Sequence, residues 1–183
     1  VQTLVVSTRP KVAVISTGNE LVAPGAPLRR GQIPESNSVL LAGMVIAADA
    51  EVIARESVDD EGTALQLALA RAVDAGAGVV VFSGGVSAGA FEVVRNELAE
   101  YMEFIQVAMQ PGKPQGFGVT SGGALLFGLP GNPVSAAVSF EVFVRPALLA
   151  LQGRTAIHRP VLRLPASVAW RTPPGRRQYL PAV

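Results

Sequence analysis

Hydrophobic residues recur along most of this chain in two patterns, short β-branched runs and longer segments with three- or four-residue spacing. The first pattern predicts buried strands and the second predicts helices. The strands expected in this way span residues 12–16, 51–58, 79–82, 104–109 and 124–130. The expected helices span about 37–48, 60–75, 91–99 and 133–151, and Gly153 ends the last of them. Ser36 or Asn37 fits the cap of the first helix. Strand and helix therefore alternate along the chain.

This alternation predicts a doubly wound α/β fold with three layers, in which a sheet lies between two layers of helices. The run 79–82 is uninterrupted and apolar, which is typical of a central parallel strand that is buried on both faces. In such sheets ligands bind beyond the carboxyl ends of the strands. The residues that directly follow the predicted strands are therefore the first candidates for a functional site.

The pattern changes at both ends of the chain, and a proline- and glycine-rich segment at 23–36 predicts a long loop. We expect residues 1–9 to be a linker from an upstream domain and residues 10–153 to form the α/β domain. Residues 154–183 alternate apolar with basic and polar positions, which predicts two strands of a separate, incomplete β unit.

Composition narrows the class of protein. Of the 183 residues, 49% are hydrophobic and 16% are charged, which supplies a sizeable core and excludes a disordered chain. The net charge of +1 provides no overall field for nucleic acid, and the absence of cysteine excludes thiolate metal sites and thiol nucleophiles. No signal-peptide pattern or run of about 18 apolar residues is present. We expect a cytoplasmic protein without a nucleic-acid or membrane partner.

Three loops rich in glycine and proline stand beside the predicted strands: SGGVSAG at 83–89, PGKP at 111–114 and LPGNPVS at 129–135. Glycine lets a backbone approach a ligand closely, and successive N–H groups in such turns form anion-binding concavities. Any one of these loops fits an ordinary connection between a strand and a helix. Three of them so close in sequence indicate one large anionic ligand.

Single residues within these loops add to this interpretation. Asn132 and Ser135 lie at the start of the last predicted helix, where unpaired N–H groups favour an anion. Asn132 equally fits a helix cap that precedes Pro133 as the first helical residue. Lys113 lies between two prolines that restrict its backbone, which predicts a phosphate or oxyanion partner rather than a solvated side chain.

Three acidic residues, Glu20, Asp59 and Glu92, fall at the same predicted edge of the sheet. Magnesium prefers carboxylate oxygens, often one or two beside substrate phosphates. Each acid alone fits a helix cap or a first-turn residue, but together they match a metal and phosphate site. His158 is the only histidine and lies in the tail, so Ser83 and the other serines of the loops lack a base for nucleophilic catalysis.

Several motifs together resemble the MoeA family of molybdopterin molybdenumtransferases, which is related to plant molybdenum insertase domains and to the gephyrin E domain. The motifs are STGNEL (16–21), GQIPESN (31–37), SGGVSAGAFEVV (83–94), VAMQPGKPQGFG (107–118) and FGLPGNPVSA (127–136). The resemblance covers about residues 10–153, which correspond to the family's MogA-like domain. The segment GRRQYLPA (175–182) resembles the start of the family's C-terminal β-barrel domain.

The resemblance implies a reaction in which molybdate is inserted into adenylylated molybdopterin and AMP is released, with Mg²⁺ or another divalent cation assisting. It implies catalytic roles for Glu20, Asp59, Glu92 and Lys113, with Asp59 and Glu92 as metal ligands. It implies substrate binding by residues of the loops and of the first strand end: Thr17, Gly18, Ser83, Gly84, Gly85, Ser87, Pro114, Pro130, Gly131, Asn132, Pro133 and Ser135. It also implies a homodimer that contacts an adenylyltransferase and apo-molybdoenzymes.

The chain departs from the family pattern at a few positions. Glu92 stands where most members have aspartate, and Asn19 where aspartate is frequent. Gln106 and Gln110 stand where many members carry lysine, which removes two positive charges from the expected molybdate site. Glutamine still donates hydrogen bonds, but we expect weaker binding of a doubly charged oxyanion unless other groups compensate. We expect no activity from these residues alone, because the family's N-terminal domains complete the active site across a dimer.

Two other functions stay open. A MogA-type adenylyltransferase shares the fold, but its loops tend to read TGGTG where this chain has SGGVSAG, and it lacks GLPGNPVS. A non-catalytic binding or scaffold module is also compatible with the sequence, because the same surface can keep the fold and lose the chemistry.

Overall fold

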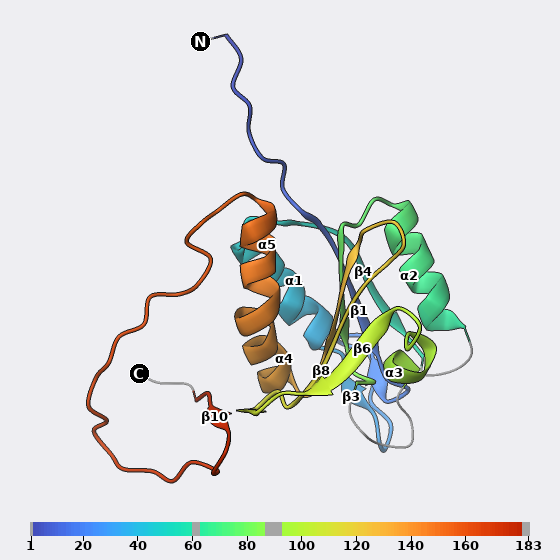
Figure 1. Ribbon diagram of the computed structural model, residues 1–183. Coiled ribbons are helices and arrows are strands. Elements are labelled where there is room, and N and C mark those ends of the chain that lie inside the picture. The colour runs from blue at the N-terminus through green and yellow to red at the C-terminus, as the bar shows by residue number, and fades with distance from the viewer. Residues whose placement is uncertain (1, 60–62, 87–92, 181–183) are drawn as a thin grey trace.

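A six-stranded sheet lies between two layers of helices in the computed structural model, which describes residues 2–59, 63–86 and 93–180 (Figure 1). The strand order is β4–β1–β5–β9–β8–β6. The strand bounds are β1 Lys11–Thr17, β4 Glu51–Val58, β5 Val79–Ser83, β6 Met102–Gln106, β8 Pro114–Val119 and β9 Leu125–Leu129. The first four strands in the order are parallel, whereas β8 pairs antiparallel with both of its neighbours, β9 and β6. The predicted three-layer α/β class is confirmed, and the sheet is mixed.

The sequence pattern missed β8, because glycine weakens the strand signal and the segment lacks β-branched residues before Val119. Two of its glycines allow close packing against β6. A Cβ atom on Gly116 would lie 2.8 Å from a ring carbon of Phe104, and one on Gly118 would overlap the carbonyl oxygen of Tyr101. The same glycines that hide this strand in the sequence therefore let it pair with its neighbour.

One face of the sheet is covered by α1 (Asn37–Ala47) and by a continuous helix made of α4 (Pro133–Ser139), the π-helical turn η1 (Phe140–Val144) and α5 (Arg145–Leu151). The continuous helix is long and apolar enough to cross a membrane by length and composition, with a mean hydropathy of 1.7. Its buried residues pack against the strands, as in the core helix of a globular domain: Ala136, Phe140, Val144 and Leu148.

The other face is covered by α2 (Ala64–Asp74) and α3 (Val93–Glu97). The tetrad of β5 supplies both cores, because Val79 and Val81 pack with α1 and α4, whereas Val80 and Phe82 pack with α2. All four side chains are fully buried. The prediction of a central strand buried on both faces is confirmed.

Two small parallel sheets lie outside the main one. The strand β2 (Leu21–Val22) pairs with β3 (Ile33–Pro34) across the segment that was expected to be a loop. The strand β7 (Met109–Gln110) pairs with β10 (Arg177–Gln178), which lies in the C-terminal tail. The expectation of two strands in the tail was wrong for the described residues 154–180, which contain β10 alone.

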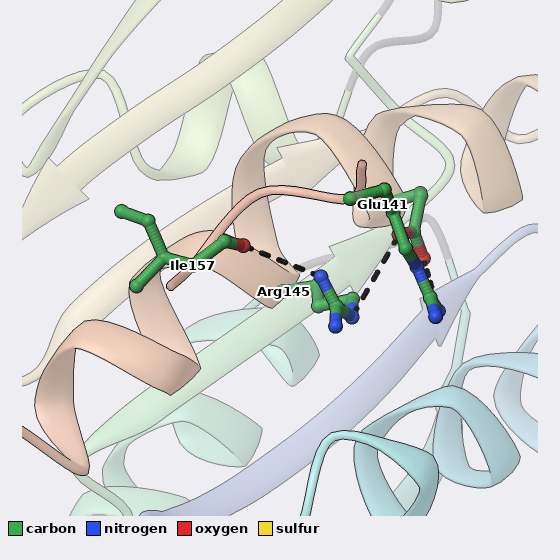
Figure 2. A network of polar contacts seen from close by, with 4 residues as sticks. Glu141, Arg145 and Ile157 are labelled. Atoms are coloured by element: carbon green, nitrogen blue, oxygen red, sulfur yellow. Dashed lines mark hydrogen bonds and ion pairs between the residues drawn. The ribbon is translucent and has the colours of Figure 1, made fainter. Parts of the chain in front are cut away.

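The first residues of the tail are hydrogen-bonded to the long helix (Figure 2). Arg145 donates a hydrogen bond to the carbonyl oxygen of Ile157 at 3.3 Å, and Arg159 donates to Glu141 at 2.7 Å. The hydrogen bond and the charge of Glu141 raise the pKa of Arg159. From there the tail runs outside the domain and returns to β7 (Figure 1).

Candidate functional site

The three glycine- and proline-rich loops meet at one edge of the sheet. Thr17, Ser83 and Leu129 end the parallel strands β1, β5 and β9 at this edge, with Ser83 paired to Leu129. β8 begins here because it runs antiparallel to β9, and β6 ends here with Gln106 opposite Pro114. The loops after β5 and β9 and the lysine-bearing loop before β8 therefore lie side by side, as the sequence predicted.

The turn after β5 depends on glycine. Gly84 and Gly85 have φ of +100° and +62°, a region that favours glycine. A Cβ atom on Gly84 would lie 2.5 Å from the carbonyl oxygen of Thr17, and one on Gly131 would lie 3.4 Å from the Cα atom of Gly84. The N–H of Gly84 donates to Leu129 at 3.1 Å. The turn after β5 thus approaches the end of β1 more closely than a side chain on Gly84 would allow, and the turn after β9 packs against it.

Asn37 joins two of these loops, a role that sequence reasoning missed. Its Nδ2 atom donates to the Oγ atom of Ser83 and to the carbonyl oxygen of Gly131, each at 2.7 Å. The sequence suggested Ser36 or Asn37 as a helix cap. Ser36 occupies the cap position, but its side chain makes no cap hydrogen bond. The only available signal was that Asn37 follows a long loop at the carboxyl edge of the sheet.

Glu35 fixes the start of α1 against β1. Its side chain is buried, with 6% exposure, and one oxygen accepts from the Oγ atom of Ser16 at 2.9 Å. It also accepts from the backbone N–H of Ser38 at 2.7 Å and from the hydroxyl of Ser38. A carboxylate that accepts helix N–H groups stabilises the helix start. Glu35 therefore caps the start of α1, a role that was expected of Ser36 or Asn37.

The turn after β9 leads into α4 through Asn132. The Oδ1 atom of Asn132 accepts from the N–H groups of Val134 at 3.1 Å and Ser135 at 3.2 Å, and Pro133 is the first helical residue. The interpretation of Asn132 as a helix cap is confirmed. Its role in binding an anion stays a prediction, as does the role of Ser135.

The lysine-bearing loop is tied to α4 by Gln115. This buried side chain donates to the carbonyl oxygen of Gly112 at 2.6 Å and to the Oγ atom of Ser139 at 2.7 Å. The carbonyl oxygen of Lys113 accepts from Val107 at 2.8 Å, which closes the loop. Within the described ranges the half-buried side chain of Lys113 has no ion-pair partner.

The C-terminal tail brings a guanidinium group to this loop. Arg176 donates to the Oε1 atom of Gln110 at 3.0 Å, and the backbone N–H of Tyr179 donates to the Gln110 carbonyl oxygen at 2.8 Å. Gln110 is one of the two positions where the family pattern led us to expect lysine. A positive charge is therefore present beside Gln110 after all, but it comes from a residue that was not among the candidates.

The candidate acids lie at the corner between β1 and β4. Asp59 follows β4 and is exposed, as is Glu20, whose carboxylate oxygens lie 2.9 Å from a Cβ atom built on Gly18. The N–H of Gly18 donates to Val58 at 3.4 Å, which places the two acids at neighbouring strand ends. Glu92 and Ser87 lie outside the described residues. Among the described residues no group of three metal-ligating side chains is found.

The sequence of this chain is similar to those of known proteins. Residues 13–150 match the protein family described as "Probable molybdopterin binding domain". The chain is 46% identical, over 98% of its length, to molybdopterin molybdenumtransferase 2 of Mycobacterium tuberculosis. The chain belongs to the MoeA family. It is also 40% identical over 84% of its length to the molybdopterin molybdenumtransferase of Nostoc sp.. It spans 46% and 36% of the lengths of these two MoeA relatives, less than half of each.

Solved structures agree with this assignment. The MoeA protein of Pyrococcus horikoshii superposes with a TM-score of 0.69 and 38% identity, over 80% of this chain and 36% of that one. The MoaB protein of Pyrococcus furiosus gives a TM-score of 0.61 at 17% identity over 96% of its own length, which shows the fold alone. Membership of the MoeA family and the MogA-like fold, both predicted from the motifs, are therefore confirmed.

Proposed function

We propose that this chain is the molybdopterin-handling part of a molybdopterin molybdenumtransferase, which inserts molybdate into adenylylated molybdopterin and releases AMP. One observation carries the proposal: three loops suited to anions meet at one sheet edge, and two cationic side chains, Lys113 and Arg176, lie at the same edge. Molybdate, the pterin phosphate and the adenylate are all anions. A protein with a net charge of +1 must hold such ligands by local geometry.

The proposal divides the ligand between two groups of residues. Lys113 and Arg176 supply charge-assisted hydrogen bonds to the oxyanion, beside Pro114 and the hydroxyl of Ser135. The phosphates lie against the neutral donors of the turns after β1 and β5, which include Thr17, Ser83 and the adjacent glycines. Water cleaves the phosphoanhydride bond, which releases AMP and leaves the other phosphate on the pterin. The two dithiolene sulfurs then bond to the held molybdate, and one of its oxygens leaves as water with the two thiol protons.

The acids at the corner between β1 and β4 fit a hard cation that is shared with the substrate. Glu20 and Asp59 offer two exposed carboxylates there, and magnesium is often held by one or two carboxylates together with substrate phosphates. When bound, the cation polarises phosphate oxygens. We assign Asp59 as one of its ligands, and Glu92 as a second on the family resemblance.

The family resemblance further implies a cytoplasmic homodimer that receives its substrate from an adenylyltransferase and delivers its product to apo-molybdoenzymes. These parts of the proposal concern the whole protein, because the chain spans less than half of its relatives.

Diffraction from crystals soaked in tungstate, a heavier analogue of molybdate, tests the site directly. We expect an anomalous peak bounded by Lys113, Arg176 and Ser135, and displacement of tungstate when molybdate is added. Soaking with sulfate at the same concentration is the control for a general anion site. A tungstate peak elsewhere, or none at this edge, would contradict the proposed function.

A further inference from the structure

We propose that Asn37 is a positioning residue for the anion site. Through its amide it holds the turn after β5 and the turn after β9 in one arrangement, and it directs the hydroxyl of Ser83 as a hydrogen-bond donor toward an anionic oxygen of the ligand. The identity of that ligand rests on the proposed function, whereas the arrangement of the two turns does not.

The orientation of the Asn37 amide follows from its partners. The carbonyl oxygen of Gly131 can only accept, so the Asn37 atom 2.7 Å away must be the nitrogen. The same nitrogen lies 2.7 Å from the Oγ atom of Ser83, which therefore accepts from it. A hydroxyl that accepts from one partner keeps its own proton for another. Because Ser83 is 1% exposed and has no other partner within the described residues, that proton is directed to whatever occupies the turn.

Unpartnered polar atoms mark the same place. The Oγ1 atom of Thr17 and the Oδ1 atom of Asn37 are buried, and each lacks a hydrogen-bond partner within the described ranges. Thr17 is 5% exposed, and its Oγ1 atom lies 3.0 Å from a Cβ atom built on Gly84. Buried polar groups are nearly always paired, so such atoms indicate an absent ligand or water.

Asn37 is itself held rigidly, which a positioning role requires. It occupies the first position of α1, and Glu35 fixes that turn through hydrogen bonds from Ser16 and Ser38. Donors that are fixed before the ligand arrives cost no reorganisation when it binds. Asn37 thus passes the rigidity of α1 to two loops that lie 46 and 94 residues further along the chain.

The substitution Asn37→Asp tests this role with almost no change in shape. A carboxylate cannot donate to Gly131, and it accepts the proton of Ser83, which removes both functions at once. The matched control is Ser36→Asp, which adds the same charge one residue earlier, at an exposed position whose side chain makes no cap hydrogen bond. Both variants and the parent chain are titrated with inorganic pyrophosphate, a probe for the phosphates that are proposed to lie at Ser83, by calorimetry at one ionic strength.

We expect Asn37→Asp to bind pyrophosphate about tenfold more weakly or worse, because a hydrogen bond to a charged ligand is lost. Ser36→Asp should stay within about twofold of the parent chain. Ser83→Ala should weaken binding as well, and the double variant should lose less than the sum of the two single changes, since both remove donation by the same hydroxyl. These results would support the inference.

The outcomes separate this inference from the proposed function. If the parent chain binds pyrophosphate but Asn37→Asp binds equally well, or Ser36→Asp is weakened as much, the inference is overturned and the proposed function stands. If the parent chain binds no pyrophosphate, the proposed phosphate subsite fails and the proposed function fails with it. Amide exchange without ligand then decides the inference: Asn37→Asp, unlike Ser36→Asp, must speed exchange at Gly84 and Ala136, whose N–H groups are bonded beside the two turns. Unchanged exchange would overturn it.

Discussion

The two parts of the anion-binding edge are built in different ways. The first part, at the ends of β1, β5 and β9, consists of glycine turns, hydroxyls and the amide of Asn37, all of them neutral. The second part, at β7 and the start of β8, carries the two positive charges of Lys113 and Arg176. Parallel strands position the first part, whereas a buried glutamine and a returning tail position the second.

This difference indicates that the first part recognises the ligand by its shape and the second part by its charge. Neutral donors act only at hydrogen-bond distance, so the first part must be held tightly, and its glycines and Asn37 do this. A charge acts over a longer range and tolerates small displacements, so the second part can rest on longer side chains and on a segment distant in sequence. An anion with both a bulky phosphate end and a compact oxyanion end requires both parts.

The largest expected effect comes from breaking the first part at Gly84. An alanine there would adopt a φ of +100° and bring its Cβ atom 2.5 Å from the carbonyl oxygen of Thr17. We expect Gly84→Ala to lower the free energy of unfolding by about 3 kcal/mol, measured by urea denaturation.

Gly31 provides the matched control for this change. It has a similar φ of +87°, but nothing lies within 4 Å of a Cβ atom built there. Gly31→Ala should cost only the backbone strain, about 1 kcal/mol. If the two variants lose the same stability, the close approach of the strand ends to Gly84 contributes nothing.

The sequence allowed most of the first part to be predicted. Gly84, Gly85 and Gly131 follow apolar strands directly, so local pattern alone placed them at the carboxyl edge. Asn37 was misinterpreted because an asparagine at a helix start is, by local criteria, a cap. Its actual partners are distant in sequence, and only the folded chain brings them together.

Much of the second part could not be predicted from local pattern. The motif PGKP identified Lys113, but β8 was hidden by its glycines, and Arg176 lies 66 residues from the Gln110 side chain that it contacts. The expected loss of charge at Gln110 followed from that position alone. A tail that returns to the domain supplies the charge from elsewhere, which no periodicity reveals.

The next effect, on binding, comes from removing charge in the second part. Lys113→Gln keeps a side chain of similar length and removes the cation. We expect molybdate affinity to fall by about 2 kcal/mol, roughly thirtyfold, in calorimetric titrations of the full chain. The affinity of the parent chain should also fall as salt is added, and the variant should respond less.

Lys11 is the control for this substitution. It is an exposed lysine at the start of β1, which is the opposite edge of the sheet. Lys11→Gln removes the same charge and should leave molybdate affinity within about twofold of the parent value, since it lies beyond the screening distance of the site. Equal losses in the two variants would mean that net charge, and not the placement of Lys113, determines binding.

The smallest effect is expected at the hydrogen bond that holds the lysine-bearing loop. Ser139→Ala removes one of two acceptors of the Gln115 amide, but the carbonyl oxygen of Gly112 remains at 2.6 Å. We expect a loss of about 1 kcal/mol in the free energy of unfolding, because a buried donor is left partly unsatisfied. The exposed Ser121 is the control, and Ser121→Ala should change stability by less than about 0.5 kcal/mol.

Molybdate affinity should fall less for Ser139→Ala than for Lys113→Gln, because pairing of β7 with β10 still holds the preceding residues. A loss of affinity as large as that of Lys113→Gln would mean that the charged part needs the same exact placement as the neutral part, and the division between shape and charge would be wrong.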